Sequence, residues 1–400
     1  MGEQHALSTH THEEGAFRPM QRATTNTKKN IFWSSLAAVS FLAVPCSGLT
    51  LEFIMGGEGE STLTLGGVVA GIYQYQVLDR DDGGRDEGGG AFAFQPEVSF
   101  QPTAGDEIFV KLGFAADNGL NDRTPFTLGT WGGDLEDDVK NIGGRDRDYL
   151  LTAWYKHSFE FSENHRLGLT GGLIDATDYL DENVYSNDEY TQFLNPALVN
   201  GPNAFLPSYD IGGVVEWQTG AFGVKGVVMN VGENDDGNSF WYYGVQLGYT
   251  LKTTLGEGNY RVIFSEAGDD FLNPEGTCTE SRASLLLSFD QQLGDLLGAF
   301  IRFGWQDDQA AIDYEAIYSG GLNISGRLWR RAQDNIGIAY GYLEGGNSGI
   351  DRAQVFEAYV RFMLNDYFAL TADLQYQDER LEEDGGPKGV IPGIRLTAEF

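Results

Sequence analysis

The sequence has 400 residues, is rich in glycine (54 residues) and aromatic residues (13%), and carries a formal net charge of −33. Beyond the N-terminal region no stretch approaches the roughly 18–20 apolar residues that a membrane-spanning helix needs, which excludes a helical membrane protein. The negative charge argues against nucleic acid or anionic lipid as a partner, because both bind positive surfaces.

The first 48 residues are typical of a secretory signal peptide. Lys28 and Lys29 form a basic start, residues 31–44 form an apolar run, and small residues around Gly48 provide a cleavage site. Signal peptides of this kind direct a protein out of the cytoplasm. We therefore expect the mature chain to begin near residue 49.

Other interpretations of this region stay open. The start is long, so Met20 is an alternative initiator. A short anchor helix would need a longer apolar run, and a lipoprotein attached at Cys46 is disfavoured by the proline before it. We expect residues 49–60 to form a short N-terminal segment and residues 61–400 to form the main domain.

From residue 61 onward, apolar and polar residues alternate in segments of about ten, the pattern of β-strands with two different faces. Sixteen such segments are expected, an even number as in bacterial single-chain barrels. They lie near residues 61–78, 91–101, 107–116, 149–161, 165–174, 208–218, 221–230, 239–252, 258–266, 280–290, 296–306, 314–328, 334–343, 352–364, 367–376 and 390–400.

The connections alternate in length. Every second one is short, as at 162–164, 219–220 and 365–366, and the others are longer. Short turns on one side and long loops on the other are typical of outer-membrane barrels. A soluble sandwich would mix the lengths. The sequence therefore predicts an all-β protein, a transmembrane antiparallel β-barrel with short periplasmic turns and long extracellular loops.

The last segment shows how the faces divide. Ile394 and Leu396 share one side with Phe400, whereas Arg395 and Glu399 lie on the other. A charge at mid-bilayer costs roughly 2–4 kcal/mol, so the apolar side must face lipid and the polar side a wet lumen. Phe400 also resembles the C-terminal assembly signal of outer-membrane proteins.

Aromatic residues gather at the strand ends on the lipid side, which indicates two interfacial girdles. The expected loop-end girdle is Tyr149, Tyr209, Trp241, Tyr243, Tyr314, Tyr342 and Tyr376. The expected turn-end girdle is Phe159, Phe161, Trp217, Tyr367 and Phe400.

The lumen face is expected to carry both signs of charge, which either orients water and polyols or merely keeps the wall hydrated. The bases are Lys111, Lys156, Arg166, Lys225, Arg261, Arg302, Arg327, Arg361 and Arg395. The acids are Glu97, Glu160, Glu216, Glu357, Asp373 and Glu399. Glycines at several lumen positions, Gly298 and Gly337 among them, argue against a lumen filled by side chains.

Loops 117–148 and 175–207 exceed 30 residues, more than a surface cap needs. The second has six acids, no Lys or Arg, and several aromatic rings. Carboxylates accept hydrogen bonds from hydroxyls, and aromatic rings stack on sugar faces. This loop therefore suits a carbohydrate-binding constriction of the channel, which we call the eyelet. Alternatively, the acidic loops bind divalent cations that bridge lipopolysaccharide.

Catalysis is not expected. After the signal region the only histidines are His157 and His165, which do not form a metal site. A serine hydrolase would need a serine beside His157 on the same face, but Ser158 is expected to face inward and Phe159 occupies that face. We expect no enzyme activity, no cofactor and no metal.

Several segments stand out as motifs. They are GLIDATDY (172–179), YTQFLNPA (190–197), FIRFG (300–304), GGLNISGRLWRRAQDNIGIA (320–339), and ADLQY (372–376) followed by GIRL (393–396). Together they resemble the carbohydrate-selective porins of the OprB type. The resemblance implies a sixteen-stranded channel for glucose-like sugars, narrowed by inward-folded loops with charged and aromatic residues.

We therefore predict passive diffusion of small carbohydrates through the outer membrane of a Gram-negative bacterium. The alternative is a general or cation-preferring porin with no sugar site. Expected partners are sugars, outer-membrane lipid and lipopolysaccharide, and a homo-oligomer is possible. The residues expected to line the pore or bind sugar are Trp154, Lys156, Asp178, Tyr185, Tyr190, Arg302, Arg327, Glu357 and Arg361.

Overall fold

A computed structural model describes residues 50–55, 61–80, 83–383 and 385–400. The predicted signal peptide lies outside the described residues and stays a prediction. The strands are β1 (Leu51–Met55), β2 (Ser61–Arg80), β3 (Glu87–Thr103), β4 (Asp106–Leu112), β5 (Phe114–Ala116), β6 (Leu150–Ser162), β7 (His165–Ile174), β8 (Asp210–Thr219), β9 (Phe222–Val231), β10 (Phe240–Thr253), β11 (Gly256–Leu272), β12 (Thr279–Leu293), β13 (Leu297–Gln306), β14 (Tyr314–Ser325), β15 (Asn335–Gly345), β16 (Ile350–Met363), β17 (Phe368–Leu381) and β18 (Lys388–Glu399).

Helices are few and short. They are η1 (Ile142–Gly144), η2 (Ala176–Asp178), α1 (Pro196–Val199), η3 (Pro202–Ala204) and η4 (Gly326–Trp329). In the described part of the chain, none of them is long and apolar enough to cross a membrane.

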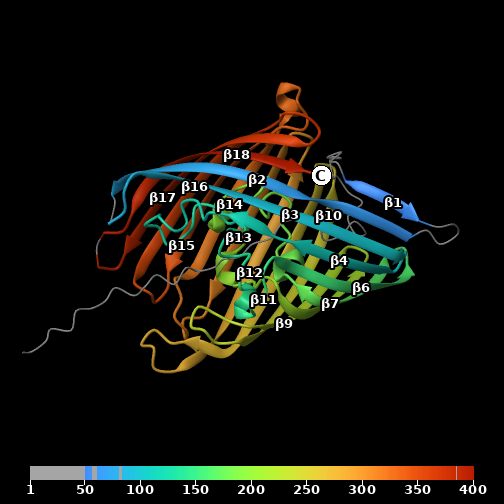
Figure 1. Ribbon diagram of the computed structural model, residues 1–400, viewed down its shortest axis with the longest axis horizontal. Coiled ribbons are helices and arrows are strands. Elements are labelled where there is room, and N and C mark those ends of the chain that lie inside the picture. Colours follow the sequence, from blue (N-terminus) through green and yellow to red (C-terminus); the bar gives the residue numbers. More distant parts are fainter. Residues whose placement is uncertain (1–49, 56–60, 81–82, 384) are drawn as a thin grey trace, which may run out of the picture.

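Each barrel strand pairs antiparallel with the next, and β18 pairs with β2 to close the sheet (Figure 1). The backbone N–H of Phe400 donates to Gly67 O at 3.1 Å, and Gly67 N–H donates to Phe400 O at 2.9 Å, so the last residue lies on the closing seam. The short β1 pairs with β2 beside the barrel. Because β4 and β5 are one strand interrupted at Gly113, the described residues form a sixteen-stranded barrel, as predicted.

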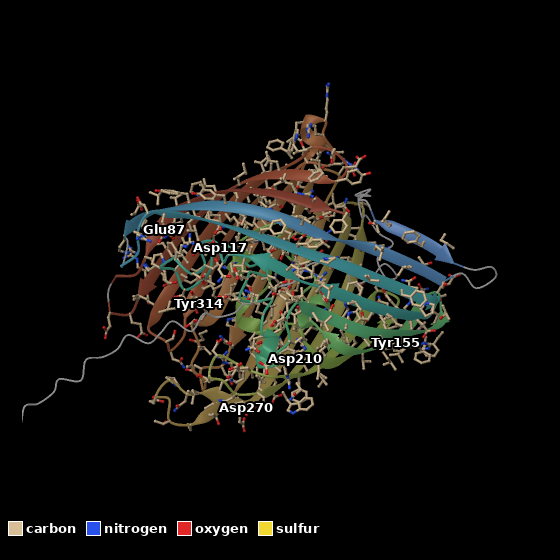
Figure 2. The ribbon with its side chains drawn as sticks, viewed as in Figure 1. Glu87, Asp117, Tyr155, Asp210, Asp270 and Tyr314 are labelled. Atoms are coloured by element: carbon tan, nitrogen blue, oxygen red, sulfur yellow. The ribbon has the colours of Figure 1, made fainter. Side chains whose placement is uncertain are left out.

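The two ends of the barrel differ as expected from the connection lengths. Glu87, Asp117 and Tyr314 lie toward the end with long loops, and Tyr155 lies toward the end with short turns (Figure 2). On the outer wall, Trp241 is 50% exposed at the loop end and Phe161 is 68% exposed at the turn end, as girdle residues should be. The outer wall therefore carries the apolar surface that lipid requires.

Two expected girdle residues are buried instead, so that part of the prediction is wrong. The Tyr209 hydroxyl donates to Asp134 at 2.5 Å, and the Tyr314 hydroxyl donates to Glu379 at 3.5 Å. Both rings pack within the barrel because acceptors lie there, Asp134 on the loop 117–149 and Glu379 on the wall strand β17, which strand alternation alone does not reveal.

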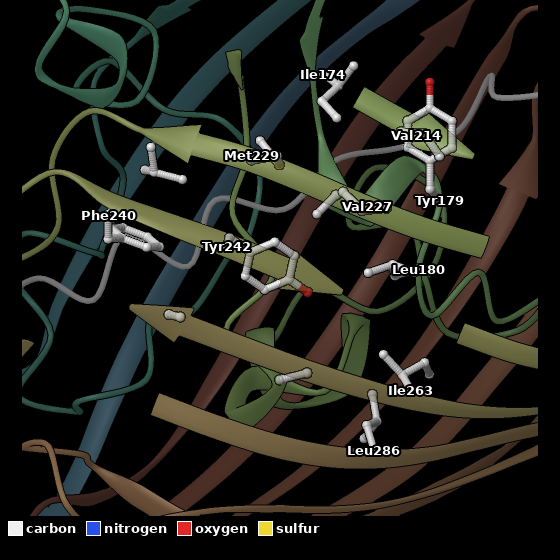
Figure 3. Packing of buried hydrophobic residues seen from close by; sticks show 14 of the residues in the cluster. Ile174, Tyr179, Leu180, Val214, Val227, Met229, Phe240, Tyr242, Ile263 and Leu286 are labelled. Atoms are coloured by element: carbon white, nitrogen blue, oxygen red, sulfur yellow. The ribbon is translucent and has the colours of Figure 1, made fainter. Parts of the chain in front are cut away.

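The core of this molecule lies inside the barrel. Tyr179 and Leu180, from the loop between β7 and β8, pack against residues on the inner faces of β8 to β12, including Val214, Met229 and Ile263 (Figure 3). Residues 175–209, which we call the inward loop, therefore cover part of the lumen wall. The charged groups discussed below lie at the edge of this packed region.

Candidate functional site: the eyelet beside the inward loop

Arg302, on β13, is fully buried and holds the inward loop. Its Nε lies 3.0 Å from Asp181 and its Nη1 donates to Ser186 Oγ at 2.7 Å. Its Nη2 donates to the backbone oxygens of Ser186 and, at 3.2 Å, Val199. Each guanidinium nitrogen is thus engaged by the loop. Arg302 lies inside the lumen as the alternation predicts, and its guanidinium is fully buried against the inward loop that it positions.

Glu357 and Tyr190 also hold the inward loop. Glu357, on β16, accepts hydrogen bonds from the backbone N–H groups of Leu194 at 2.6 Å and Asn195 at 2.9 Å. The Tyr190 hydroxyl accepts from Gln95 Nε2 at 3.0 Å and from the backbone N–H of Asp134 at 3.1 Å. Both side chains are fully buried, so both stabilise the loop where the sequence suggested contact with sugar.

A second loop, residues 117–149, folds inward and braces the first. Trp131 Nε1 donates to Glu189 O at 2.8 Å. Gln375, on β17, donates to Thr130 O at 2.8 Å. The inward loop is therefore supported both by the wall and by this second loop, which gives the channel a fixed constriction.

The tip of the inward loop presents apolar surface. Val184 is 51% exposed. Tyr185 beside it is partly buried and packs on β13, where a Cβ added to Gly298 would lie 2.1 Å from the Tyr185 ring. Any side chain at position 298 would clash with this ring, so only glycine fits there. The sequence-based argument that such glycines leave the lumen empty is wrong at this position.

A row of four alternating charges lies on the lumen side of the wall and the inward loop. Lys156 (β6) pairs with Glu216 (β8), and Lys225 (β9) pairs with Glu182 of the inward loop and lies 3.7 Å from Glu216. We call Lys156, Glu216, Lys225 and Glu182 the charge ladder. Its side chains are 18–29% exposed, unlike the fully buried Arg302 and Asp181 pair. These groups are both paired and accessible to water.

Asp175 and Asp178 lie at the base of the inward loop and are buried. Burial, reinforced by the neighbouring Asp178, raises the pKa of Asp175 to about 8. Burial also raises the pKa of Asp178, against the attraction of Lys111 and Lys225. Asp178 therefore presents no exposed carboxylate to the lumen.

The remaining predicted residues are more scattered. Trp154 is buried and stacks on Phe109 with ring centroids 5.0 Å apart. Arg361 donates to Glu399 at 2.5 Å near the turn end of the lumen. Of the predicted set, Lys156 joins the ladder, while Tyr185 lies at the partly exposed loop tip.

The placement of Arg327 on the lumen wall is wrong. The strand expected over 314–328 ends at Ser325, and Arg327 lies exposed in η4 at the turn end. The chain leaves the strand there because Ser325 Oγ accepts the N–H of Arg327 and caps a helical turn. Arg327 therefore cannot bind solute in the eyelet.

Glu182, Glu216 and Lys225 were not among the predicted site residues. Glu216 and Lys225 could be assigned to the lumen by alternation, and they are cross-strand partners on β8 and β9. Glu182 is one of six acids in its loop, and nothing local to the sequence distinguishes it from the others. Only the folded loop brings it to Lys225.

Comparisons with known proteins agree with this architecture. The family model described as "Carbohydrate-selective porin, OprB family" matches residues 131–400. The chain is 29% identical over 321 residues to an uncharacterized protein of Aquifex aeolicus strain VF5, covering 78% of this chain and 89% of that one.

Two solved structures share the fold. The high-pH structure of Pseudomonas putida OprB aligns with a TM-score of 0.67 at 14% identity, covering 84% of this chain and 94% of that one. The DcaP channel of Acinetobacter baumannii aligns with a TM-score of 0.53 at 10% identity, covering 88% and 100%. The protein is an outer-membrane channel through which sugars diffuse, and the chain belongs to the OprB family of carbohydrate-selective porins.

Proposed function

We propose that sugars cross this channel between the charge ladder and the tip of the inward loop. The observation that carries the proposal is the ladder itself, four charged side chains that are mutually paired yet remain 18–29% exposed. Paired carboxylates and ammonium groups offer both acceptors and donors to hydroxyls. A sugar can exchange hydrogen bonds with them in place of water as it passes.

The loop tip supplies the apolar counterpart. Val184 and Tyr185 follow Glu182 by two and three residues and leave part of their surface exposed. Sugar rings have apolar C–H faces as well as hydroxyl edges. An eyelet with charge on one side and apolar surface on the other matches that division.

The charge balance of the ladder favours neutral solutes. It holds two lysines and two glutamates, so its formal charge is zero although the chain carries −33. An eyelet of one sign would select ions of the opposite sign. The balance therefore supports sugar passage over the cation-preferring alternative.

Glucose block of the single-channel current tests the proposal. Glu182→Gln removes one carboxylate acceptor from the ladder, so the apparent affinity for glucose should fall about tenfold, equivalent to about 1.4 kcal/mol. Glu382→Gln makes the same charge change in an exposed extracellular loop and serves as the control. Equal block in wild type and Glu182→Gln, at unchanged conductance, would place the sugar path elsewhere.

A further inference from the structure

The turn between β14 and β15 differs from the other turns at its end of the barrel. Among the described barrel strands, the other connections at this end hold two to four residues, whereas this one holds nine (326–334) and includes η4. In Figure 1 it is the orange helical turn that stands out beyond the rim. Short turns face the periplasm in outer-membrane barrels, so we call residues 326–334 the periplasmic knob.

The periplasmic knob has a defined internal structure. The Asp334 side chain, 1% exposed, accepts from Arg331 Nε at 2.5 Å and from Trp329 Nε1 at 3.2 Å. It also accepts from the backbone N–H of Met363 at 2.9 Å, and Asp334 O accepts from Gly326 N–H at 2.7 Å. One buried carboxylate thus fixes the knob to the end of β16.

This arrangement leaves two cations uncompensated. Arg331 is paired with Asp334, but Arg327 and Arg330 are exposed, and the described residues place no carboxylate within ion-pair distance of either one. Leu328 between them is 65% exposed, and Leu364 in the adjoining turn is 57% exposed. The knob therefore presents guanidinium groups together with aliphatic surface.

The knob begins where the lipid-facing wall ends. Ser325 and Asn335 form the last pair of the β14–β15 ladder. The lipid-facing Leu322 and Ile338, paired three residues deeper in the wall, are 44% and 38% exposed. At about 3.3 Å per residue, the knob begins about 10 Å along the strands beyond that pair. For strands tilted by about 45° this is about 7 Å along the membrane normal, which places the knob in the headgroup layer.

We propose that the periplasmic knob binds the phosphate groups of anionic phospholipids in the periplasmic leaflet. A guanidinium donates two parallel hydrogen bonds to a phosphate, and exposed leucines at an interface enter the acyl boundary. The overall charge of −33 repels such lipids, so attraction is confined to a local cationic surface. The knob anchors the rim of the barrel to its lipid neighbours and has no part in the sugar path.

Native mass spectrometry of the detergent-purified barrel, titrated with dioleoyl phosphatidylglycerol, tests this proposal. Removing both free cations (R327Q with R330Q) should lower the apparent affinity about tenfold, and added salt should weaken wild-type binding. The control R85Q with R352Q makes the same charge change at the loop end, where Arg85 pairs with Glu87 and the partly exposed Arg352 with Asp351, and should leave affinity within about twofold. L328S should weaken binding of phosphatidylglycerol and phosphatidylcholine alike.

Several results would overturn the proposal. One is wild-type affinity in the R327Q, R330Q variant, and another is an equal loss in the loop-end control. A third is an R327Q, R330Q variant that binds lipid as the wild type does but no longer co-sediments with peptidoglycan. The knob would then bind the cell wall. Heat-modifiable migration in gels verifies that each barrel is folded, and R327K with R330K, which keeps the charge, should retain most of the lipid binding.

Discussion

Lys225 lies between two carboxylates, Glu182 on the inward loop and Glu216 on the wall. It joins the inward loop to the barrel wall, and its charge offsets half of the negative charge of these two carboxylates. A lysine in this position keeps the eyelet neutral and also draws the loop toward β9.

Neutralising Lys225 should therefore change ion selectivity. Lys225→Gln leaves two carboxylates facing the same water, so the cation-to-anion permeability ratio should rise about threefold at low salt, where screening is weakest. Reversal potentials in a salt gradient measure this ratio. Lys252→Gln, which removes an exposed lysine at the turn end, is the control. An unchanged ratio in Lys225→Gln would mean that permeating ions do not pass the ladder.

Asp175 should make the inward loop sensitive to pH. Its pKa is raised by burial to about 8, so the folded loop favours the neutral carboxyl. The stability this gives is fully present below the ordinary value of 3.8 and is lost as the pH rises to about 8. Current noise from loop motion should increase severalfold between pH 5 and pH 8.5. The current noise of Asp175→Asn channels should stay low from pH 5 to pH 8.5. If the noise of this variant rises with pH as it does in the wild type, another group is responsible.

At the scale of whole elements, the inward loop depends on a few buried charges from the wall. Arg302 contacts three different loop residues, and Glu357 binds two backbone N–H groups farther along. These contacts hold a loop with little regular structure in one position. The constriction is thus set by the barrel wall as much as by the loop sequence.

Arg302→Ala should release this loop. It leaves Asp181 buried without its cation, at a cost of about 3–5 kcal/mol. Single-channel conductance should rise and become noisier, and glucose block should weaken because Glu182 moves away from Lys225. Arg123→Ala, which removes a partly exposed arginine of the second loop, is the matched control. A quiet channel of wild-type conductance would show that Arg302 does not hold the constriction.

The strands were predictable because a two-faced wall enforces alternation on every residue it contains. β7 coincides with its predicted range, and the sixteen strands are confirmed. The role of Arg302 was not predictable, because a lumen arginine has the same sequence pattern whether it meets water or a loop. Arg327 was misplaced because alternation continued past Ser325, while the turn is shaped by contacts of Trp329 and Arg331 with Asp334, which lies seven residues after Arg327.

At the scale of the whole molecule, charge is divided by location. The chain carries −33 in total, the ladder at the eyelet is balanced, and the periplasmic knob is cationic. Acidic outer loops raise the local concentration of cations, but the eyelet offers no net charge to retain them. This division suits a channel whose solutes are neutral and hydrophilic.

Liposome swelling with solutes of similar size and different charge tests the central claim most directly. Proteoliposomes are diluted into isotonic glucose, arabinose, lysine hydrochloride or sodium gluconate, and the initial swelling rates are compared. If the eyelet is a sugar path, the two sugars should enter severalfold faster than either charged solute. Entry of lysine as fast as glucose or faster would contradict this account and identify the protein as a general or cation-preferring porin.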